Sequence, residues 1–65
     1  MKTIYYVSKL ENNREWVLGQ FDGAIEWTAA DGVMAEWRIE SDDRDEMEEL
    51  AAVHGGSVES FERAW

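Results

Sequence analysis

A run of acidic residues is the part of this sequence in which residue type and spacing could carry a function. Six carboxylates fall within eight consecutive positions of a predicted helix: Asp42, Asp43, Asp45, Glu46, Glu48 and Glu49. At ~1.5 Å per residue these positions span about 12 Å, or roughly one negative charge per 2 Å of helix axis. Duplex DNA carries about one per 1.7 Å. The run therefore predicts a surface that mimics DNA and fills a basic groove, and the alternative is an ordinary solvated helix face.

Catalytic and metal-binding chemistry has little support elsewhere in the chain. The one histidine, His54, falls in the last turn of the predicted helix, where it complements the helix dipole, and no serine is marked as its partner. A calcium loop that starts at Asp43 would need glycine at its sixth position, and Glu48 stands there. Cysteine is absent, so no thiolate zinc site can form, and neither type of glycine-rich phosphate loop is present. We expect no enzyme, no metal and no cofactor.

Composition restricts the partner and the compartment. Fifteen acidic against six basic residues give a formal net charge of −9, which argues against direct binding to nucleic acid or to an anionic membrane. A partner should therefore be basic. No stretch approaches the ~18 apolar residues of a membrane span, and residues 1–9 lack the apolar region of a signal peptide. We expect a cytoplasmic protein with a single compact domain over residues 1–65, and a monomer.

The elements that position the acidic run are a sheet and a helix. Residues 3–9, 16–21, 24–29 and 33–40 have the composition or the alternation of strands. Asp22-Gly23 predicts a two-residue hairpin turn, and Ala30-Asp31-Gly32 predicts a three-residue hairpin loop with glycine in the left-handed conformation. A polar loop, residues 11–14, joins the first two strands.

These two turns fix a register for the predicted sheet. The first pairs Phe21 with Ala24, Leu18 with Trp27 and Trp16 with Ala29. The second pairs Ala29 with Val33, Trp27 with Ala35 and Ile25 with Trp37. The resulting core face consists of Trp16, Leu18, Ile25, Trp27, Val33, Ala35, Trp37 and Ile39.

Acidic side chains also fall on the opposite face of this predicted sheet. Glu26 and Glu36 come out directly opposite each other, and Glu40 follows on the same side. Like charges that face each other across a strand pair are destabilising. Either the two side chains splay into water beside Arg38, or the repulsion is kept because the acidic surface has a use.

The helix begins after Ser41, its predicted N-cap, and ends at Gly55-Gly56. Met47, Leu50, Ala51 and His54 share one side of it. Residues 57–65 fit a short helix or a returning strand, and the strand is slightly favoured. The predicted fold is α+β, a single antiparallel sheet of four to five strands with one main α-helix packed on its Trp-rich face.

The chain resembles the phage-encoded anti-CRISPR proteins. The resemblance is carried by small size, acidity, the absence of cysteine and the acidic run within Ser41–Leu50, and in size and opening sequence the chain is most similar to an inhibitor of the type I-C system. It implies a protein in the host bacterial cytoplasm that binds the Cascade surveillance complex or its nuclease-helicase. Several such inhibitors are DNA mimics. No role is transferred to any single residue, because these inhibitors share no diagnostic motif.

We therefore expect a non-catalytic inhibitor of a CRISPR-Cas effector. Its partner-binding residues would be the six carboxylates of the run together with Glu26, Glu36 and Glu40. The alternatives are an immunity protein or antitoxin that neutralises a cationic nuclease or toxin, or a protein-interaction module that binds through exposed aromatic residues such as Phe21, Tyr5 and Trp65.

Overall fold

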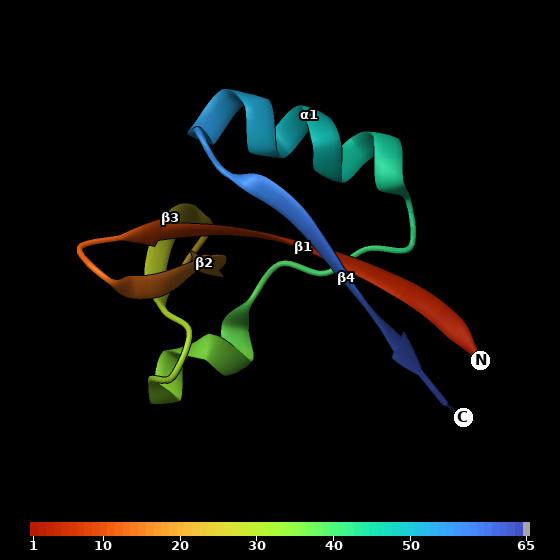
Figure 1. Cartoon of the computed structure of the whole chain (residues 1–65), viewed down its shortest axis with the longest axis horizontal. Helices are drawn as coiled ribbons and strands as arrows, with labels where there is room; N and C mark the ends of the chain where they lie inside the picture. The colour runs from red at the N-terminus through yellow and green to blue at the C-terminus, as the bar shows by residue number, and fades with distance from the viewer. Residues whose placement is uncertain (65) are drawn as a thin grey trace.

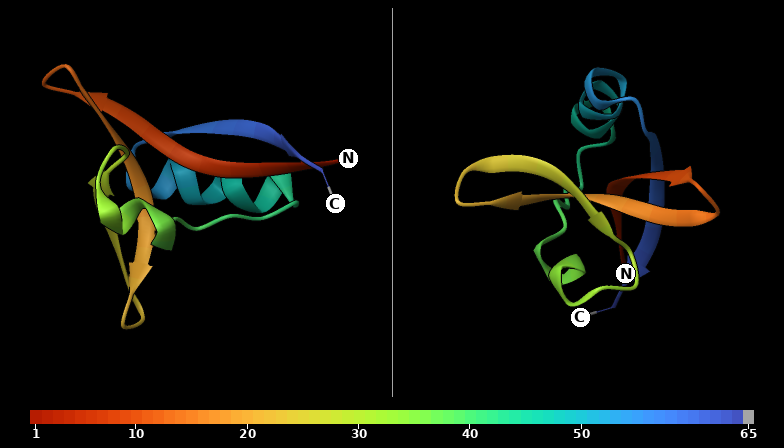
Figure 2. Two further views of the ribbon diagram at one scale, coloured as in Figure 1. Left: turned by 90° about the horizontal axis from the view of Figure 1, so that it is seen from below. Right: turned by 90° about the vertical axis from the view of Figure 1, so that its left-hand side faces the viewer.

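The computed structural model describes residues 1–64, and it confirms an α+β fold with a four-stranded antiparallel sheet and one α-helix. In chain order the elements are β1 (Lys2–Glu11), β2 (Arg14–Phe21), β3 (Ala24–Ala29), the 3₁₀-helix η1 (Val33–Trp37), α1 (Arg44–His54) and β4 (Ser57–Arg63). The strand order is β3-β2-β1-β4. The helix α1 lies along β1 and β4 on one side of the sheet, and η1 lies on the other side (Figures 1 and 2).

Both short hairpins follow from their turn residues. Asp22 and Gly23 have φ of 50° and 81°, the positive values that a two-residue turn needs, and the predicted pairing of β2 with β3 is confirmed. The β1–β2 connection is equally tight. Asn12 and Asn13, predicted only as part of a polar loop, have φ of 55° and 62°. Asparagine tolerates this conformation better than most residues, so the sequence carried a turn signal here too.

The predicted strand over residues 33–40 is wrong. Gly32 has φ −91° and ψ 166°, so the left-handed glycine that the predicted hairpin loop needs is missing. Its carbonyl instead accepts a hydrogen bond from Ala35 at 3.1 Å, which begins the 3₁₀-helix η1. The predicted pairings of β3 with residues 33–37 therefore do not form, and Glu26 lies opposite Gly19 rather than Glu36.

Only the end of that segment is extended. Arg38 forms an isolated bridge with Gly19 of β2, and Ser41 forms one with Tyr5 of β1. The direct pairing of β1 with β2 covers only residues 8–11 and 14–17. The extended segment thus occupies the place between β1 and β2 where these strands diverge (Figure 1).

The core lies between the sheet and α1. Its buried cluster contains Val7, Leu18, Met47 and Ala51. The partly buried side chains packed against this cluster are Tyr5, Trp27, Ile39, Leu50 and Val58. Leu18, Trp27 and Ile39 were thus predicted correctly as core residues.

The rest of the predicted core face is largely wrong. Val33 and Trp37 are 87% and 55% exposed, and Ile25 is 39% exposed. Trp16 and Ala35 are half-buried. The reason is η1, which turns residues 33–37 away from the face that α1 covers. Of the tryptophans that the structure describes, Trp27 is the one that packs against the core cluster.

The helix starts two residues later than predicted. Asp43, not Ser41, is its N-cap, and the Asp43 carboxylate accepts a hydrogen bond from the backbone N–H of Glu46 at 3.1 Å. The Ser41 hydroxyl accepts from the N–H of Asp43 at 3.0 Å, while the Ser41 backbone pairs with Tyr5. The acidic run therefore begins before the helix, and Asp42 is outside it.

The predicted stop at Gly55-Gly56 is confirmed, and the two glycines serve different purposes. Gly55 has φ of 80°, the left-handed conformation of a helix C-cap, and donates to Ala51 O at 2.8 Å. Gly56 lies where the chain passes close to β1 and Trp27. The chain then enters β4, as the favoured interpretation of residues 57–63 predicted, and Trp65 lies outside the described residues.

Candidate functional site

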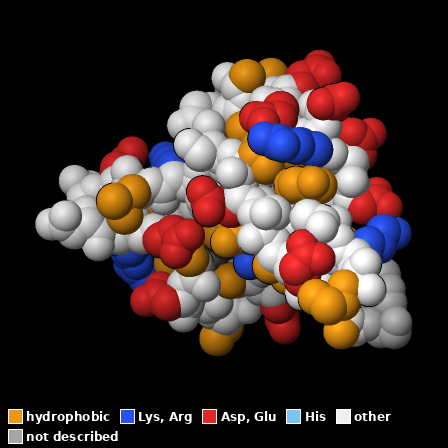
Figure 3. All heavy atoms as spheres, turned by 45° about the vertical axis from the view of Figure 1, so that its right-hand side comes forward, with side chains coloured by type: hydrophobic (Ala, Val, Ile, Leu, Met, Phe, Trp, Pro, Cys, Tyr) orange, Lys and Arg blue, Asp and Glu red, His pale blue; other side chains and the backbone are white. Residues whose placement is uncertain are grey.

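Four carboxylates of α1 form one continuous acidic surface. Asp45, Glu46, Glu48 and Glu49 are all exposed. The pairs 45–48 and 46–49 are three residues apart and the pair 45–49 is four apart, spacings at which side chains of a helix are neighbours, about 5–6 Å between Cβ atoms. Five residues span about 7.5 Å of axis, so roughly one charge per 2 Å is retained. We call these four residues the acidic helix face, and Figure 3 shows acidic side chains gathered along the upper part of the molecule, where α1 lies.

The helix holds this surface at a fixed place on the fold. Met47 and Ala51, one turn apart, are 0% and 4% exposed and bury the opposite side of α1 in the core. Asp43 caps the N-terminus. Asp45 and Glu46 lie in the first turn, where the helix dipole stabilises negative charge. The backbone that carries these carboxylates is therefore already ordered before a partner binds.

Few internal cations reach the acidic helix face. Within residues 1–64, no ion pair or side-chain hydrogen bond is formed by the carboxylates of Asp45, Glu46 and Glu49. Glu48 is paired with Arg44 Nε at 3.4 Å, and both side chains are more than half exposed, so this pair is weak. Three of the four carboxylates thus lack a neutralising partner in the described chain.

Asp42 and Asp43 are part of the predicted run but not of this surface. Asp42 is held by Lys2 Nζ at 2.8 Å, and the hydrogen bond and charge of Lys2 lower the pKa of Asp42 below its ordinary value. Asp43 is engaged as the N-cap. Two of the six predicted residues are therefore occupied by the fold itself.

Glu40, another predicted binding residue, is bound by two arginines. Its carboxylate accepts from Arg38 at 2.6 Å and from Arg63 at 2.7 Å. Partial burial raises the pKa of Glu40, but the hydrogen bonds and charges of both arginines outweigh this effect and leave the pKa below its ordinary value. Arg38 also stacks 4.1 Å from the centre of the Tyr6 ring. Glu40 is therefore part of an ion-pair network within the fold and is not a free acidic side chain.

Glu26 and Glu36 are exposed and lie away from the acidic helix face. Glu26 shares the sheet face of Gly19, which carries η1, whereas the neighbouring pair Leu18 and Trp27 faces α1. Glu36 is part of η1 itself. The strand pair that was predicted to place these two glutamates opposite each other therefore does not form.

All six basic side chains have a carboxylate partner in the molecule. Besides the pairs of Lys2, Arg38, Arg44 and Arg63 described above, Lys9 contacts Glu11 and Arg14 contacts Asp31, each at 3.4 Å. Lys9 Nζ also lies 4.5 Å from the centre of the Trp27 ring. The positive charge is thus distributed in local pairs, and no basic patch suited to phosphates is formed by the described residues.

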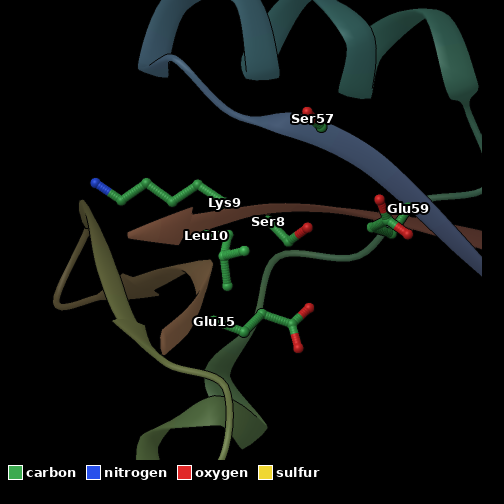
Figure 4. A pocket seen from close by; sticks show the side chains of 6 residues that line it. All are labelled: Ser8, Lys9, Leu10, Glu15, Ser57 and Glu59. Carbon is green, nitrogen blue, oxygen red and sulfur yellow. The ribbon is translucent and has the colours of Figure 1, made fainter. Parts of the chain in front are cut away.

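A shallow polar depression of about 340 Å³ lies beside the β1–β4 pair (Figure 4). Its lining residues are Ser8, Lys9, Leu10, Glu15, Ser57 and Glu59. Neither serine hydroxyl makes a hydrogen bond to a lining carboxylate within the described chain, and the Lys9 side chain extends away from Ser8 and Glu15. Residues 1–64 also contain no group of three or more potential ligands that could hold a metal ion.

The residue that sequence reasoning missed as a surface feature is Trp37. It was predicted in the core, yet with Met34, Phe21 and Asp22 it lines a second depression, of about 360 Å³, where η1 meets the β2–β3 turn. The available signal was Gly32, since the 3₁₀-helix that starts there places Met34 and Trp37 one turn apart.

Comparisons with known proteins add no family to this geometry. Among the helices that the structure describes, none has the length and apolar character needed to cross a membrane. Searches against protein-family models, curated proteins and solved structures found no match for this chain.

Proposed function

We propose that this protein is a non-catalytic inhibitor that places its acidic helix face in the basic groove of a DNA-binding effector, where the carboxylates substitute for DNA phosphates. The observation that carries the proposal is that Asp45, Glu46 and Glu49 have no ion-pair partner among the described residues. A basic groove can therefore pair with them without first displacing an internal cation. The net charge of −9 supports the same partner chemistry by accelerating encounter with a positive surface.

The resemblance described above suggests which effector to test first. It implies a type I CRISPR surveillance complex or its nuclease, both of which must hold nucleic acid and so must present cations spaced for phosphates. An immunity protein or antitoxin would use the same carboxylates against a cationic nuclease or toxin. The two possibilities differ only in the partner, and a binding assay with each partner separates them.

The test compares wild-type protein with a variant that carries Asp45→Lys, Glu46→Lys and Glu49→Lys. Binding to a purified type I CRISPR surveillance complex is measured at several salt concentrations, with target DNA as competitor. Exposed ion pairs contribute about 0.2–1 kcal/mol each, so losing three weakens binding about 3- to 150-fold, before the new repulsion is counted. We expect the variant to lose binding, and wild-type binding to fall as salt or target DNA is added.

A matched control separates this surface from net charge. Glu15, Glu59 and Glu62 are exposed and lie on the strands, so reversing all three to lysine gives the same net charge as the helix variant. The control variant should retain most of the binding. Equal losses in the two variants would mean that only overall charge matters, and unchanged binding of the helix variant would refute the proposal. Far-UV circular dichroism verifies that both variants are folded.

A further inference from the structure

A second exposed surface lies at the other side of the sheet from α1. The side chains of Phe21, Met34 and Trp37 line the depression where η1 meets the end of the β2–β3 hairpin. Figure 2 shows η1 on the side of the sheet away from α1. Met34 and Trp37 are 44% and 55% exposed. An exposed tryptophan beside an exposed methionine leaves a large share of apolar surface in water for a chain whose core cluster has four buried residues. We call these three residues the tip patch.

Gly19 lies where two parts of the tip patch, the Phe21 ring and η1, come close to the backbone of β2. A Cβ atom at this position would lie 2.9 Å from Cζ of Phe21 and 3.3 Å from the carbonyl oxygen of Trp37. The Phe21 ring and η1 therefore both approach the backbone of β2 at Gly19. Gly19 also forms an isolated β-bridge with Arg38, so the backbone beneath this surface is hydrogen-bonded.

Three carboxylates belong to the turn, the strand and the 3₁₀-helix next to the tip patch. Asp22 lines the depression, Glu26 lies opposite Gly19 in the β2–β3 register, and Glu36 precedes Trp37 in η1. All three are exposed and form no ion pair within residues 1–64. Arg38, which directly follows Trp37 in the chain, is engaged by Glu40 and stacks on Tyr6 instead. The exposed indole thus shares the depression with Asp22, and two further unneutralised carboxylates lie on β3 and η1, the elements next to it.

This combination identifies the chemistry of the occupant. A guanidinium group stacks on aromatic rings and pairs with carboxylates in its own plane, and arginine therefore satisfies both features at once. A second copy of this chain is disfavoured, because it would bring the same three carboxylates against each other on molecules that each carry a net charge of −9.

We propose that the tip patch is a docking surface for an arginine-bearing segment of a basic protein, with the guanidinium stacked on Trp37 and paired with the neighbouring carboxylates. The proposal is independent of the acidic helix face, since α1 and η1 lie on opposite sides of the sheet (Figure 1). One partner can bind the tip patch and the acidic helix face together, or a separate partner can bind each surface. In either case the tip patch adds contacts that salt alone does not remove.

The test uses ¹H–¹⁵N NMR of the full chain titrated with an acetylated tetra-arginine peptide, with tetra-lysine and tetra-citrulline peptides as controls. The protein carries the triple lysine substitution in α1, so that the acidic helix face cannot compete for the peptide. We expect shifts concentrated at Phe21, Asp22, Met34 and the Trp37 indole N–H. Arginine should bind more tightly than lysine, and citrulline should not bind.

Two variants make the result decisive. Trp37→Ala removes the stacking surface and should weaken tetra-arginine binding about 2- to 30-fold, the range of a cation–π contact. Glu26→Gln with Glu36→Gln leaves the tryptophan and should weaken binding by a similar factor that shrinks as salt is added. Shifts spread evenly over the molecule, equal affinity for arginine and lysine, or no effect of Trp37→Ala would overturn the proposal. Tip-patch shifts that depend on protein concentration without peptide would assign the surface to self-association and overturn it as well.

Discussion

Gly56 is the position at which a single methyl group should have the largest effect on this fold. It follows the helix C-cap, where the chain turns from α1 into β4. A Cβ atom there would lie 2.7 Å from Cη2 of Trp27, 2.7 Å from Cγ1 of Val7 and 2.9 Å from the carbonyl oxygen of Ser8. These distances are well below normal van der Waals separation, so Gly56→Ala requires β1, β4 or the Trp27 ring to move.

The structure offers little room for that movement. Val7 is fully buried in the core cluster, and Ser8 is paired on both sides, with Val17 of β2 and Ser57 of β4. Overpacking of this kind costs about 1–3 kcal/mol. A core of this size rarely supplies more than about 3–5 kcal/mol in total. We therefore expect Gly56→Ala to remove about half of the stability, about 2 kcal/mol, which corresponds to a fall in Tm of roughly 8–16 °C.

Gly55→Ala is the matched control. Gly55 has φ of 80° but open space where its Cβ would lie, so alanine there meets backbone strain without a clash. Left-handed alanine costs about 1–2 kcal/mol, of which about 0.4–1 kcal/mol is regained because the unfolded chain is restricted. Urea unfolding followed by tryptophan fluorescence and circular dichroism gives both free energies. If Gly56→Ala proves no more destabilising than Gly55→Ala, the expected clash of a Cβ atom at position 56 with β1 and Trp27 is refuted.

Two further predictions concern single carboxylates. Glu40→Gln should lower stability near neutral pH by about 1–3 kcal/mol, because the variant breaks charged hydrogen bonds to Arg38 and Arg63. The pKa of Glu40 is lowered in the folded state, so this stabilisation is present above the ordinary glutamate value of about 4.3 and is lost as pH falls below it; urea unfolding of both proteins across that range should show the gap closing, and a constant gap would contradict the assignment. Glu49→Gln should raise stability, since it relieves repulsion from Asp45 and Glu46 at about 0.2–0.5 kcal/mol per pair. Glu49 lies beyond the first turn, so no dipole stabilisation is lost, and a lower Tm for this variant would argue against an unneutralised acidic helix face.

Much of this fold could be predicted from the sequence, because its signals are local. Asp22-Gly23 fixes a turn and therefore a register, since the side-chain period of a strand allows no one-residue slip without exchanging the faces. Gly55-Gly56 ends the helix, and the spacing of Met47 and Ala51 identifies its buried side. The density of the acidic helix face follows from spacing along a single helix in the same way.

The rest depended on partners distant in the chain. Alternation over residues 33–40 suits a strand only if an edge is available to pair with, and here β2 and β1 receive just Arg38 and Ser41 while Gly32 starts a 3₁₀-helix. That choice exposes Trp37 and removes the pairing that would have placed Glu36 opposite Glu26.

The neutralisation of particular carboxylates was likewise a tertiary outcome. Lys2 reaches Asp42, and Arg63 reaches Glu40, across elements that are remote in sequence. Composition determined that negative charge would remain in excess, because six cations cannot neutralise fifteen carboxylates. Which carboxylates stay unpaired was decided only when the antiparallel pairing of β1 with β4 placed those cations, since an ion pair forms only between groups that the backbone brings within about 4 Å.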